Sequence, residues 1–217
     1  MYNGKNIFLS LAYLPNIQYF SKLLSGEKVI IEVHDTYQKQ TWRNRTTIYG
    51  ANGPLDLIIP VKQPNGNRTK TCDVQLDFDM PWIQTHWKAI LSAYRHSPYF
   101  GIFEEEIKPF YFTRKKYLID WNISLLDALY EMIGIEKNYT TTDNYKASDP
   151  SIYDFRNSIH PKRRMQRPDP DFFPVRYQQV FSEKHGFQSN LSFIDLLFNE
   201  GPRAVSLCRQ TIKKGNL

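Results

Sequence analysis

The chain is poor in cysteine, which limits the kinds of fold available to it. Its 217 residues include only Cys72 and Cys208, which lie far apart and in no C-x-x-C pattern. This spacing predicts neither a disulfide framework nor a zinc ribbon. No apolar run approaches the roughly 20 residues of a membrane-spanning helix, and the N-terminal segment lacks the charged and apolar regions of a signal peptide. We therefore expect a cytoplasmic protein without a membrane span.

Several familiar catalytic and nucleotide-binding motifs are also missing. The sequence contains no G-x-G-x-x-G, no G-x-x-x-x-G-K-[ST] and no G-x-S-x-G, so neither a glycine-rich phosphate loop nor a nucleophile elbow is indicated. Its histidines form no H-x-x-x-H or H-E-x-x-H pair, and we predict no metal site. The cofactor, if the protein uses one, stays unknown at this stage.

Aromatic residues and positive charge are, by contrast, abundant. Aromatic side chains make up 15% of the chain, with 14 Tyr and 14 Phe, a share that indicates a thick core, a ligand pocket or both. The formal net charge is +6, which favours an anionic small molecule as partner. The charge is spread along the chain without a long Lys/Arg block, so we do not expect a dedicated nucleic-acid-binding protein.

The first half of the sequence predicts strands connected by a helix. Residues 7–14 and 28–35 form short apolar runs that are typical of buried strands. Between them, Asn16 is a helix-start signal, apolar residues recur at helical spacing, and Gly26 is a helix-end signal. This order is typical of a βαβ unit with a parallel strand pair. Residues 46–61 predict a β-hairpin that turns at Asn-Gly-Pro.

The second half favours helices. Apolar residues recur at helical spacing over 82–97 and 123–134, and the segment 190–212 predicts two helices separated at Gly-Pro. Two Ser-x-x-Asp sequences, at 124–127 and 192–195, have the spacing of a capping box at a helix start. Proline-rich segments interrupt the helical pattern elsewhere.

We therefore predict an α/β fold: a mixed sheet with an N-terminal βαβ-like unit and β-hairpin, followed by a mainly helical C-terminal half. A single domain is expected over 1–217. Within it we expect a mixed α/β part at 1–80, a helical part at 81–137, an extended loop or lid at 138–176 and C-terminal helices at 177–217. The loop is assigned because its sequence is rich in Pro, Asp and Arg and poor in aliphatic residues.

The segment before the predicted hairpin concentrates groups that could bind an anion. In an extended segment, alternate side chains share a face, so Arg43 and Arg45 would point the same way and could hold a diphosphate or a carboxylate. The alternative is that the neighbouring tryptophan belongs to the core and the arginines pair with nearby Asp or Glu. The candidate substrate-binding residues here are Lys39, Trp42, Arg43, Asn44 and Arg45.

Two further places could supply acid–base chemistry. His34 and Asp35 follow the second predicted strand, and functional groups of open α/β sheets gather at the carboxyl ends of strands. His86 and Tyr94 roughly share a face of the predicted helix at 82–97 and could act as general base and orienting acid in amide formation. A strand-end pair exposed to solvent and a structural histidine are the respective alternatives.

The predicted loop carries a basic stretch that could close over an anionic ligand. His160 and Lys162 lie within it, together with several arginines. We consider both a lid that covers the ligand and a solvated basic loop. His160 and Lys162 are kept as candidate substrate-binding residues.

Five blocks of the sequence, in order, resemble those of the WbqC-like family. They are YLPNIQYF from Tyr13, KQTWRNRTTI with LIIPV, WIQTHWKAILSAYRHSPYF, DFRNSIHPK and FQSNLSFIDLLFNEGP. The fourth block is similar to an insert in versions of the family from Bacteroides-like bacteria. Tyr13 becomes a candidate substrate-binding residue through the first block. Ala12 departs from the pattern, because the family usually has Gln at that place.

The resemblance implies a role in surface-polysaccharide (O-antigen, capsule or lipopolysaccharide) biosynthesis. Relatives tend to be encoded with such genes, which suggests transfer of an acyl or aminoacyl group to a nucleotide-linked amino sugar. On this reading Arg43 and Arg45 hold phosphates with help from Lys39, and His86 or His34 acts as base. The alternative is a non-catalytic protein of the same pathway that binds an anionic ligand or a partner.

Overall fold

The computed structural model describes residues 6–212, and its N-terminal part is a βαβ unit. β1 (Asn6–Ser10) and β2 (Lys28–Glu32) pair in parallel and are connected by α1 (Ile17–Ser25). The Asn16 side chain accepts a hydrogen bond from the backbone N–H of Tyr19 at 2.8 Å and so caps α1. The N–H of Gly26 bonds the carbonyl of Lys22 and ends the helix. The predicted βαβ unit is confirmed.

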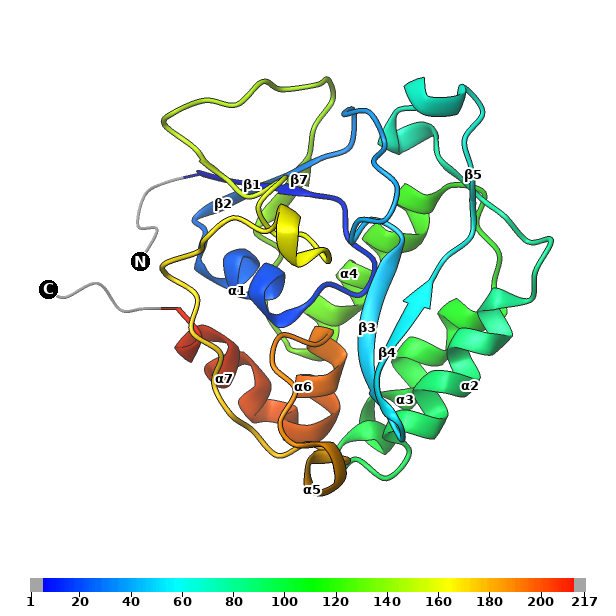
Figure 1. Cartoon of the computed structure of the whole chain (residues 1–217), viewed down its shortest axis with the longest axis vertical. Helices are drawn as coiled ribbons and strands as arrows, with labels where there is room; N and C mark the ends of the chain where they lie inside the picture. Colours follow the sequence, from blue (N-terminus) through cyan, green and yellow to red (C-terminus); the bar gives the residue numbers. More distant parts are fainter. Residues whose placement is uncertain (1–5, 213–217) are drawn as a thin grey trace, which may run out of the picture.

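Two short strands from the predicted loop complete a parallel sheet. β7 (Tyr139–Thr141) pairs with β2, and β8 (Tyr153–Asp154) pairs with β1. The order is β7-β2-β1-β8, and every pair is parallel. Figure 1 shows β1, β2 and β7 side by side at the upper left. The sequence did not indicate β7 or β8, because two or three polar and aromatic residues carry no measurable periodicity.

The predicted hairpin is present but belongs to a separate sheet. β3 (Arg45–Gly50) pairs in antiparallel fashion with β4 (Gly53–Ile58), and the connection between them is two residues long. β5 (Val61–Lys62) leaves the hairpin and pairs with β6 (Gln75–Leu76). In Figure 1 the hairpin runs between α1, α6 and α7 on one side and α2 and α3 on the other.

The rest of the chain is mainly helical, as predicted. The helices and short 3-10 turns are η1 (Gly66–Arg68), η2 (Thr71–Asp73), α2 (Trp82–Tyr94), α3 (Phe100–Ile107), η3 (Lys108–Phe112), α4 (Leu118–Met132), η4 (Arg163–Met165), α5 (Ser182–His185), α6 (Phe193–Glu200), η5 (Gly201–Arg203) and α7 (Ala204–Gln210). The α/β fold class is therefore confirmed. The mainly helical C-terminal half also contributes two strands, β7 and β8, to the parallel sheet.

Neither predicted capping box forms. α4 begins at Leu118, so Ser124 lies inside the helix, where its hydroxyl donates to the carbonyl of Trp121 at 3.3 Å. Ser192 does precede α6, but its hydroxyl donates to the carbonyl of Leu14 at 2.9 Å. The matching Asp195 carboxylate is taken up by tyrosines elsewhere in the core. Both predictions were wrong because a serine hydroxyl bonds whichever carbonyl packing places nearest.

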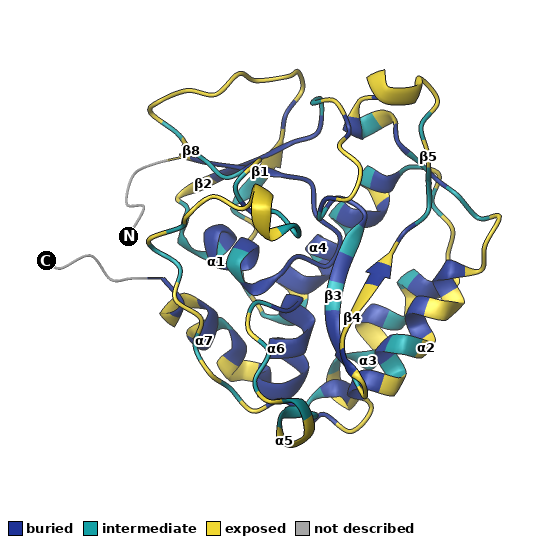
Figure 2. Cartoon of the chain, viewed as in Figure 1, coloured by how far each residue is buried: buried dark blue, intermediate teal, exposed yellow. Residues whose placement is uncertain are grey.

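The core joins the βαβ unit to the C-terminal helices. Phe20 of α1 stacks on Phe193 of α6 with ring centroids 3.7 Å apart. Figure 2 shows β1, β2 and α6 mainly buried, whereas the loop that follows β7 is exposed. This ring pair joins α1 of the βαβ unit to α6, and the carboxyl ends of the parallel strands carry polar groups.

Candidate functional site

Charged residues from distant segments meet at the carboxyl ends of the parallel strands. β2 ends at Glu32 and leads to His34 and Asp35, and β8 ends at Asp154 and leads to Arg156. All of these side chains except that of Glu32 border a pocket of about 430 Å³, large enough for a sugar-sized ligand. The lining residues are His34, Asp35, Thr36, Gln38, Tyr145, Ser148, Asp154, Arg156 and Asn157.

A buried carboxylate forms the floor beneath this pocket. Glu32 is fully buried, and its Oε1 accepts from the backbone N–H of His34 and the hydroxyl of Thr142, both at 2.8 Å. Its Oε2 accepts from the backbone N–H of Lys146 at 3.0 Å and from Nη1 of Arg156 at 3.3 Å. A buried charge that keeps four donors is well satisfied. Glu32 therefore fastens β2 to the segment that follows β7.

Arg156 connects the two sides of the pocket. Besides Glu32, it binds the Asp154 carboxylate through two nitrogens at 3.0 and 2.6 Å. Its guanidinium lies 4.6 Å from the ring centre of Phe8 on β1. Asp154 raises the pKa of Arg156 further. Because Arg156 is 8% exposed, this pairing is protected from solvent screening.

Asp35 and Arg43 form the second ion pair at this edge. An Nη2 of Arg43 donates to the Asp35 carboxylate, which also accepts the hydroxyl of Thr71 at 2.6 Å. The Arg43 side chain is 1% exposed, and its Nε has no hydrogen-bond partner among the described residues. We call Glu32, Asp35, Arg43, Asp154 and Arg156 the carboxyl-edge network. Its three carboxylates outnumber its two guanidinium groups, which makes this edge acidic.

His34 is the half-buried histidine of the pocket wall. Its Nδ1 lies 3.6 Å from Sγ of Cys72, which the chain brings to this edge because Cys72 N–H bonds the carbonyl of Val33. Burial, followed by the charge of Asp73, raises the pKa of the Cys72 thiol. The pair could not be predicted from the sequence, since His34 and Cys72 are 38 positions apart. The pair depends on the backbone hydrogen bond from the N–H of Cys72 to the carbonyl of Val33, which follows β2.

The other candidate histidine lies in a sealed network. The hydroxyl of Tyr13 lies 3.0 Å from Nδ1 of His86 and 2.9 Å from the hydroxyl of Tyr111. We call these three residues the tyrosine–histidine chain. Burial lowers the pKa of His86 to about 4, although a hydrogen bond to the backbone of Ile58 acts in the opposite direction. Tyr13 and His86 are thus brought together, but inside the core and 0% and 4% exposed.

Tyr94 does not join His86. Its hydroxyl donates to Oδ1 of Asp195 at 2.9 Å and accepts the backbone N–H of Tyr49 at 3.2 Å. Asp195 is buried, which raises its pKa, while Tyr94, Tyr177 and Gln179 donate to it and moderate that rise. Tyr94 therefore connects α2 to α6, and the two predicted partners on α2 serve different networks.

The basic segment before the hairpin is divided among three environments. Residues 39–44 are turns rather than a strand, so the predicted common face of Arg43 and Arg45 is absent. Arg45 pairs with Asp56 across the hairpin at 3.3 Å and is 22% exposed. Asn44 donates to the carbonyl of Ile59 at 2.8 Å, and Trp42 packs against the core. Lys39 is exposed. The alternative of paired arginines and a core tryptophan is what the contacts show.

The basic loop lies close to the carboxyl-edge network. His160 has its pKa lowered by burial and then by the positive charges of Lys162 and Arg43. The backbone N–H of Lys162 donates to Nδ1 of His160 at 3.0 Å. Gln38 reaches Asn157 at 3.5 Å and connects this loop to the segment after β2. The loop thus borders the pocket through Arg156 and Asn157, while His160 and Lys162 follow next to it.

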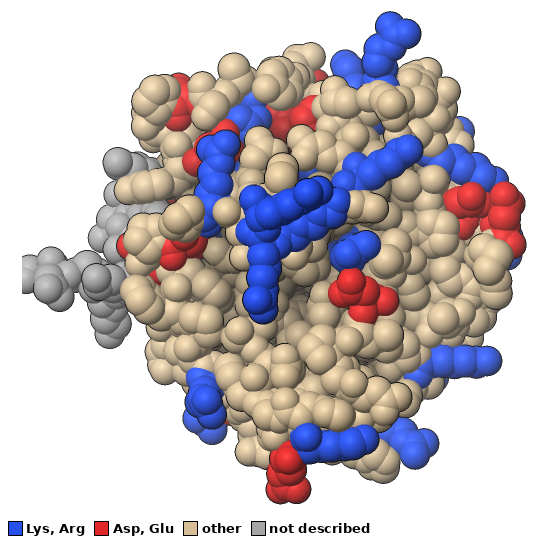
Figure 3. Space-filling view, viewed as in Figure 1, with Lys and Arg blue, Asp and Glu red and all other residues tan. Residues whose placement is uncertain are grey.

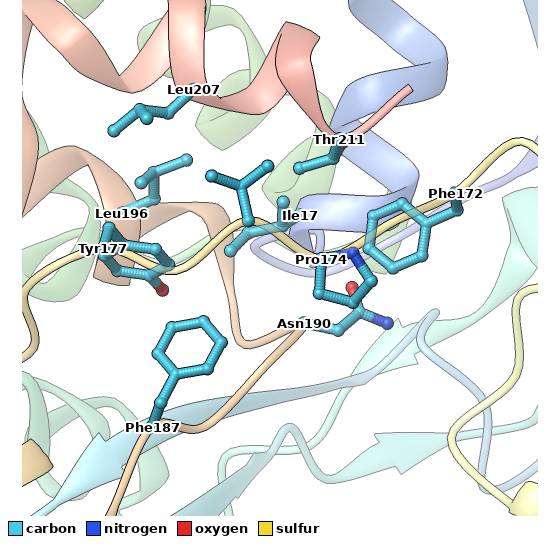
Figure 4. A pocket seen from close by; sticks show the side chains of 10 residues that line it. Ile17, Phe172, Pro174, Tyr177, Phe187, Asn190, Leu196, Leu207 and Thr211 are labelled. Carbon is cyan, nitrogen blue, oxygen red and sulfur yellow. The ribbon is translucent and has the colours of Figure 1, made fainter. Parts of the chain in front are cut away.

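A second concavity is apolar and too small to hold a ligand. It measures about 10 Å³ and lies between Ile17 of α1, Leu207 of α7 and the segment that carries Phe172 and Pro174 (Figure 4). That volume corresponds to about one water molecule. Figure 4 shows aromatic rings and aliphatic side chains around it, and few polar atoms. This cavity is a packing gap under the C-terminal segment.

Residues 6–212 contain neither a membrane-spanning helix nor a cluster of metal ligands. No helix in this range is long and apolar enough to cross a membrane. Within the same range, no three His, Cys, Asp or Glu side chains come together as a metal site would require.

Comparison with known proteins places the chain in a family. The WbqC-like protein family model matches residues 12–167, which include α1, β2, the hairpin and β8. The uncharacterized protein Rv1507c of Mycobacterium tuberculosis (strain ATCC 25618 / H37Rv) is 24% identical over 225 residues, covering 91% of this chain and 96% of that protein. No solved structure matches. The family match spans well over half of the chain and includes every residue of the carboxyl-edge network, and the chain therefore belongs to the WbqC-like protein family.

Proposed function

We propose that the pocket at the carboxyl edge binds an amino sugar and that the protein transfers an acyl or aminoacyl group to its amine. The observation that carries this proposal is the convergence of His34, Asp35, Asp154 and Arg156 on one polar pocket of about 430 Å³. The surface-polysaccharide role that the family resemblance implies supports the substrate class. The pocket also lies where ligands bind in open α/β sheets, outside the carboxyl ends of the strands.

The charge of the pocket favours the sugar rather than its phosphates. Asp35 and Asp154 line the pocket, and the guanidinium groups beside them are already paired. Carboxylates accept hydrogen bonds from sugar hydroxyl groups and from an amine. A diphosphate attached to the sugar would then lie toward His160 and Lys162, where cations gather beside the pocket. The phosphate-binding role predicted for Arg43 and Arg45, with help from Lys39, is thus proposed for the basic loop.

We assign the movement of the proton to His34, because this histidine lines the pocket. The bound ammonium group first loses one proton to solvent, and the free amine nitrogen then bonds the acyl carbon while the leaving group departs with its bonding electrons. The proton lost by the amine passes to His34 and then to the leaving group. This role requires Nε2 to be the acceptor, with Nδ1–H directed to Sγ of Cys72. His86 cannot take this role from its place in the core, since Tyr13 and the Ile58 backbone occupy its ring.

Binding and transfer can be tested separately. Calorimetry should detect binding of a uridine-diphosphate amino sugar. The N-acetylated analogue should bind much more weakly, because the acetyl group removes the charge that the acidic pocket favours. Asp35→Asn should weaken binding of the amino sugar about tenfold, which is the effect of losing one charged hydrogen bond. Arg45→Gln, on the exposed hairpin pair, is the matched control. Equal affinity for both sugars would overturn the substrate class.

The catalytic step is tested on His34→Gln. With an acyl thioester as donor, this variant should bind the amino sugar within about twofold of wild type and lose transfer at least about a hundredfold, as expected for loss of a general base. Unchanged transfer would exclude His34 as the base. Tight binding by wild type with no transfer from any thioester or acyl phosphate would establish the non-catalytic binding protein instead.

A further inference from the structure

The loop next to the pocket ends in a dense and exposed group of cations. Arg163 and Arg164 on η4 and Arg167 after it are exposed, and Lys162 precedes them. None of the four forms an ion pair with another residue in the range 6–212. Figure 3 shows Lys and Arg side chains gathered in the middle of one face, over the yellow turn of η4 in Figure 1. We call residues 162–167 the basic platform.

Hydrogen bonds hold the basic platform in a defined conformation. The N–H of Met165 donates to the carbonyl of Lys162 at 2.9 Å, and the Gln166 side chain donates to the carbonyl of His160 at 2.9 Å. The N–H of Arg167 returns to the carbonyl of Ser158 at 3.3 Å. The turn is therefore closed on itself, and its cations are presented together.

An apolar side chain lies in the middle of these cations. Met165 is 52% exposed and follows Arg164 directly on η4. A soluble polyanion offers nothing to an exposed methionine, whereas the lipid–water boundary takes up apolar side chains while its anionic head groups bind Lys and Arg. We propose that the basic platform docks the protein on an anionic membrane surface.

Apart from Lys162, which the proposed function places beside the diphosphate, the residues of the docking surface lie outside the pocket. Arg156 and Asn157, which line the pocket, lie a few residues before the platform in the same loop. Docking would therefore bring the pocket close to the lipid head groups. None of Arg163, Arg164, Met165 and Arg167 lines the pocket, so failure of docking would leave binding and transfer of a soluble substrate unchanged.

A second basic stretch offers a matched control. Arg114 lies 5.1 Å from the ring centre of Phe78, and Lys116 lies 4.9 Å from that of Tyr117. Together with Lys115 these residues carry the same charge as the three arginines of the platform. The cations of Arg114 and Lys116 lie against aromatic rings rather than around an exposed methionine.

Vesicle flotation tests the proposal. Wild type should bind phosphatidylcholine vesicles containing roughly a quarter phosphatidylglycerol and not pure phosphatidylcholine vesicles, with a strong salt dependence. R163E/R164E/R167E should weaken this binding at least about tenfold, whereas R114E/K115E/K116E should weaken it less than about threefold. Circular dichroism and urea unfolding establish that each variant is folded. No preference of wild type for the anionic vesicles, or equal losses in both triple variants, would overturn the proposal.

Met165→Ser separates a membrane from a soluble polyanion. The variant should bind anionic vesicles about threefold more weakly, because it loses apolar area at the head-group boundary. Its binding to soluble polyphosphate should equal that of wild type. Unchanged vesicle binding by Met165→Ser, together with polyphosphate binding as tight as vesicle binding, would assign the platform to a soluble polyanion and overturn the membrane surface.

Discussion

The carboxyl-edge network and the tyrosine–histidine chain are both polar groups in the interior, and they differ in charge and access. The first pairs three carboxylates with two guanidinium groups and opens on a pocket of about 430 Å³. The second contains one histidine and two tyrosines, with its central hydroxyl 0% exposed and its histidine 4% exposed. His34 and His86 thus have the same side chain and opposite surroundings.

The comparison shows that access, rather than residue type, separates a candidate reactive group from a structural one. His86 uses its ring to connect the loop after β1 with α2 and the hairpin. His34 keeps one ring edge toward the pocket. Both networks also hold their elements together, so substitutions can measure how much each contributes to stability.

The largest expected effect follows removal of Arg156. Arg156→Leu leaves the buried Glu32 carboxylate without its cationic partner, and we expect it to lower the free energy of unfolding by about 3–5 kcal/mol. Urea denaturation measures the change. The control Arg45→Leu breaks the partly exposed pair with Asp56 and should cost less than about 1 kcal/mol. Equal losses of unfolding free energy in the two variants would show that burial of the network adds nothing to stability.

The next effect concerns pH and sharpens the contrast between the histidines. Burial lowers the pKa of His86 to about 4 from an unfolded value near 6.5. The unfolded chain therefore binds the proton first as the pH falls, and the stabilisation present above pH 6.5 is lost progressively down to pH 4. That single group should lower the free energy of unfolding by about 3 kcal/mol over this range.

His86→Gln and His34→Gln isolate this contribution. Denaturation between pH 7 and 4 should show a shallower pH dependence in His86→Gln than in wild type, because the titrating ring is gone. His34→Gln is the control for loss of an imidazole at the pocket wall. The same slope in all three proteins would contradict a depressed pKa at His86.

The smallest effect tests the order within the tyrosine–histidine chain. Tyr13→Phe removes the central hydroxyl and leaves both His86 and Tyr111 without that partner, at a cost of about 2 kcal/mol. Tyr111→Phe removes only the outer hydroxyl and should cost about 1 kcal/mol. Thermal unfolding of the two single variants and the double variant measures their coupling. A larger loss in Tyr111→Phe would reverse the proposed order.

Local pattern predicted much of the fold because short-range signals control the elements concerned. Apolar runs marked β1 and β2, Asn16 and Gly26 marked the ends of α1, and helical spacing marked α2. The hairpin followed from its turn residues. These signals act within a few positions of the chain, so they can be read without knowledge of the partner segments.

The candidate site was predicted in part. His34 and Asp35 were placed at a strand end, and both line the pocket. The partners were not predictable. Arg156 meets Glu32 across 124 positions, and His34 meets Cys72 across 38. The sequence allowed Arg43 to bind either an anionic ligand or a carboxylate of the protein. Only the tertiary structure, which places Asp35 beside it, decided for the carboxylate.

The sequence by itself determined the βαβ unit, the hairpin, the helical half and the family. Tertiary structure alone decided that β7 and β8 join the sheet, that His86 is sealed while His34 faces a pocket, and that the two arginines of one segment have different partners. The physical reason is the range of the forces involved. Backbone propensity and capping act between neighbours in sequence, whereas burial and ion pairing depend on what long loops bring together in space.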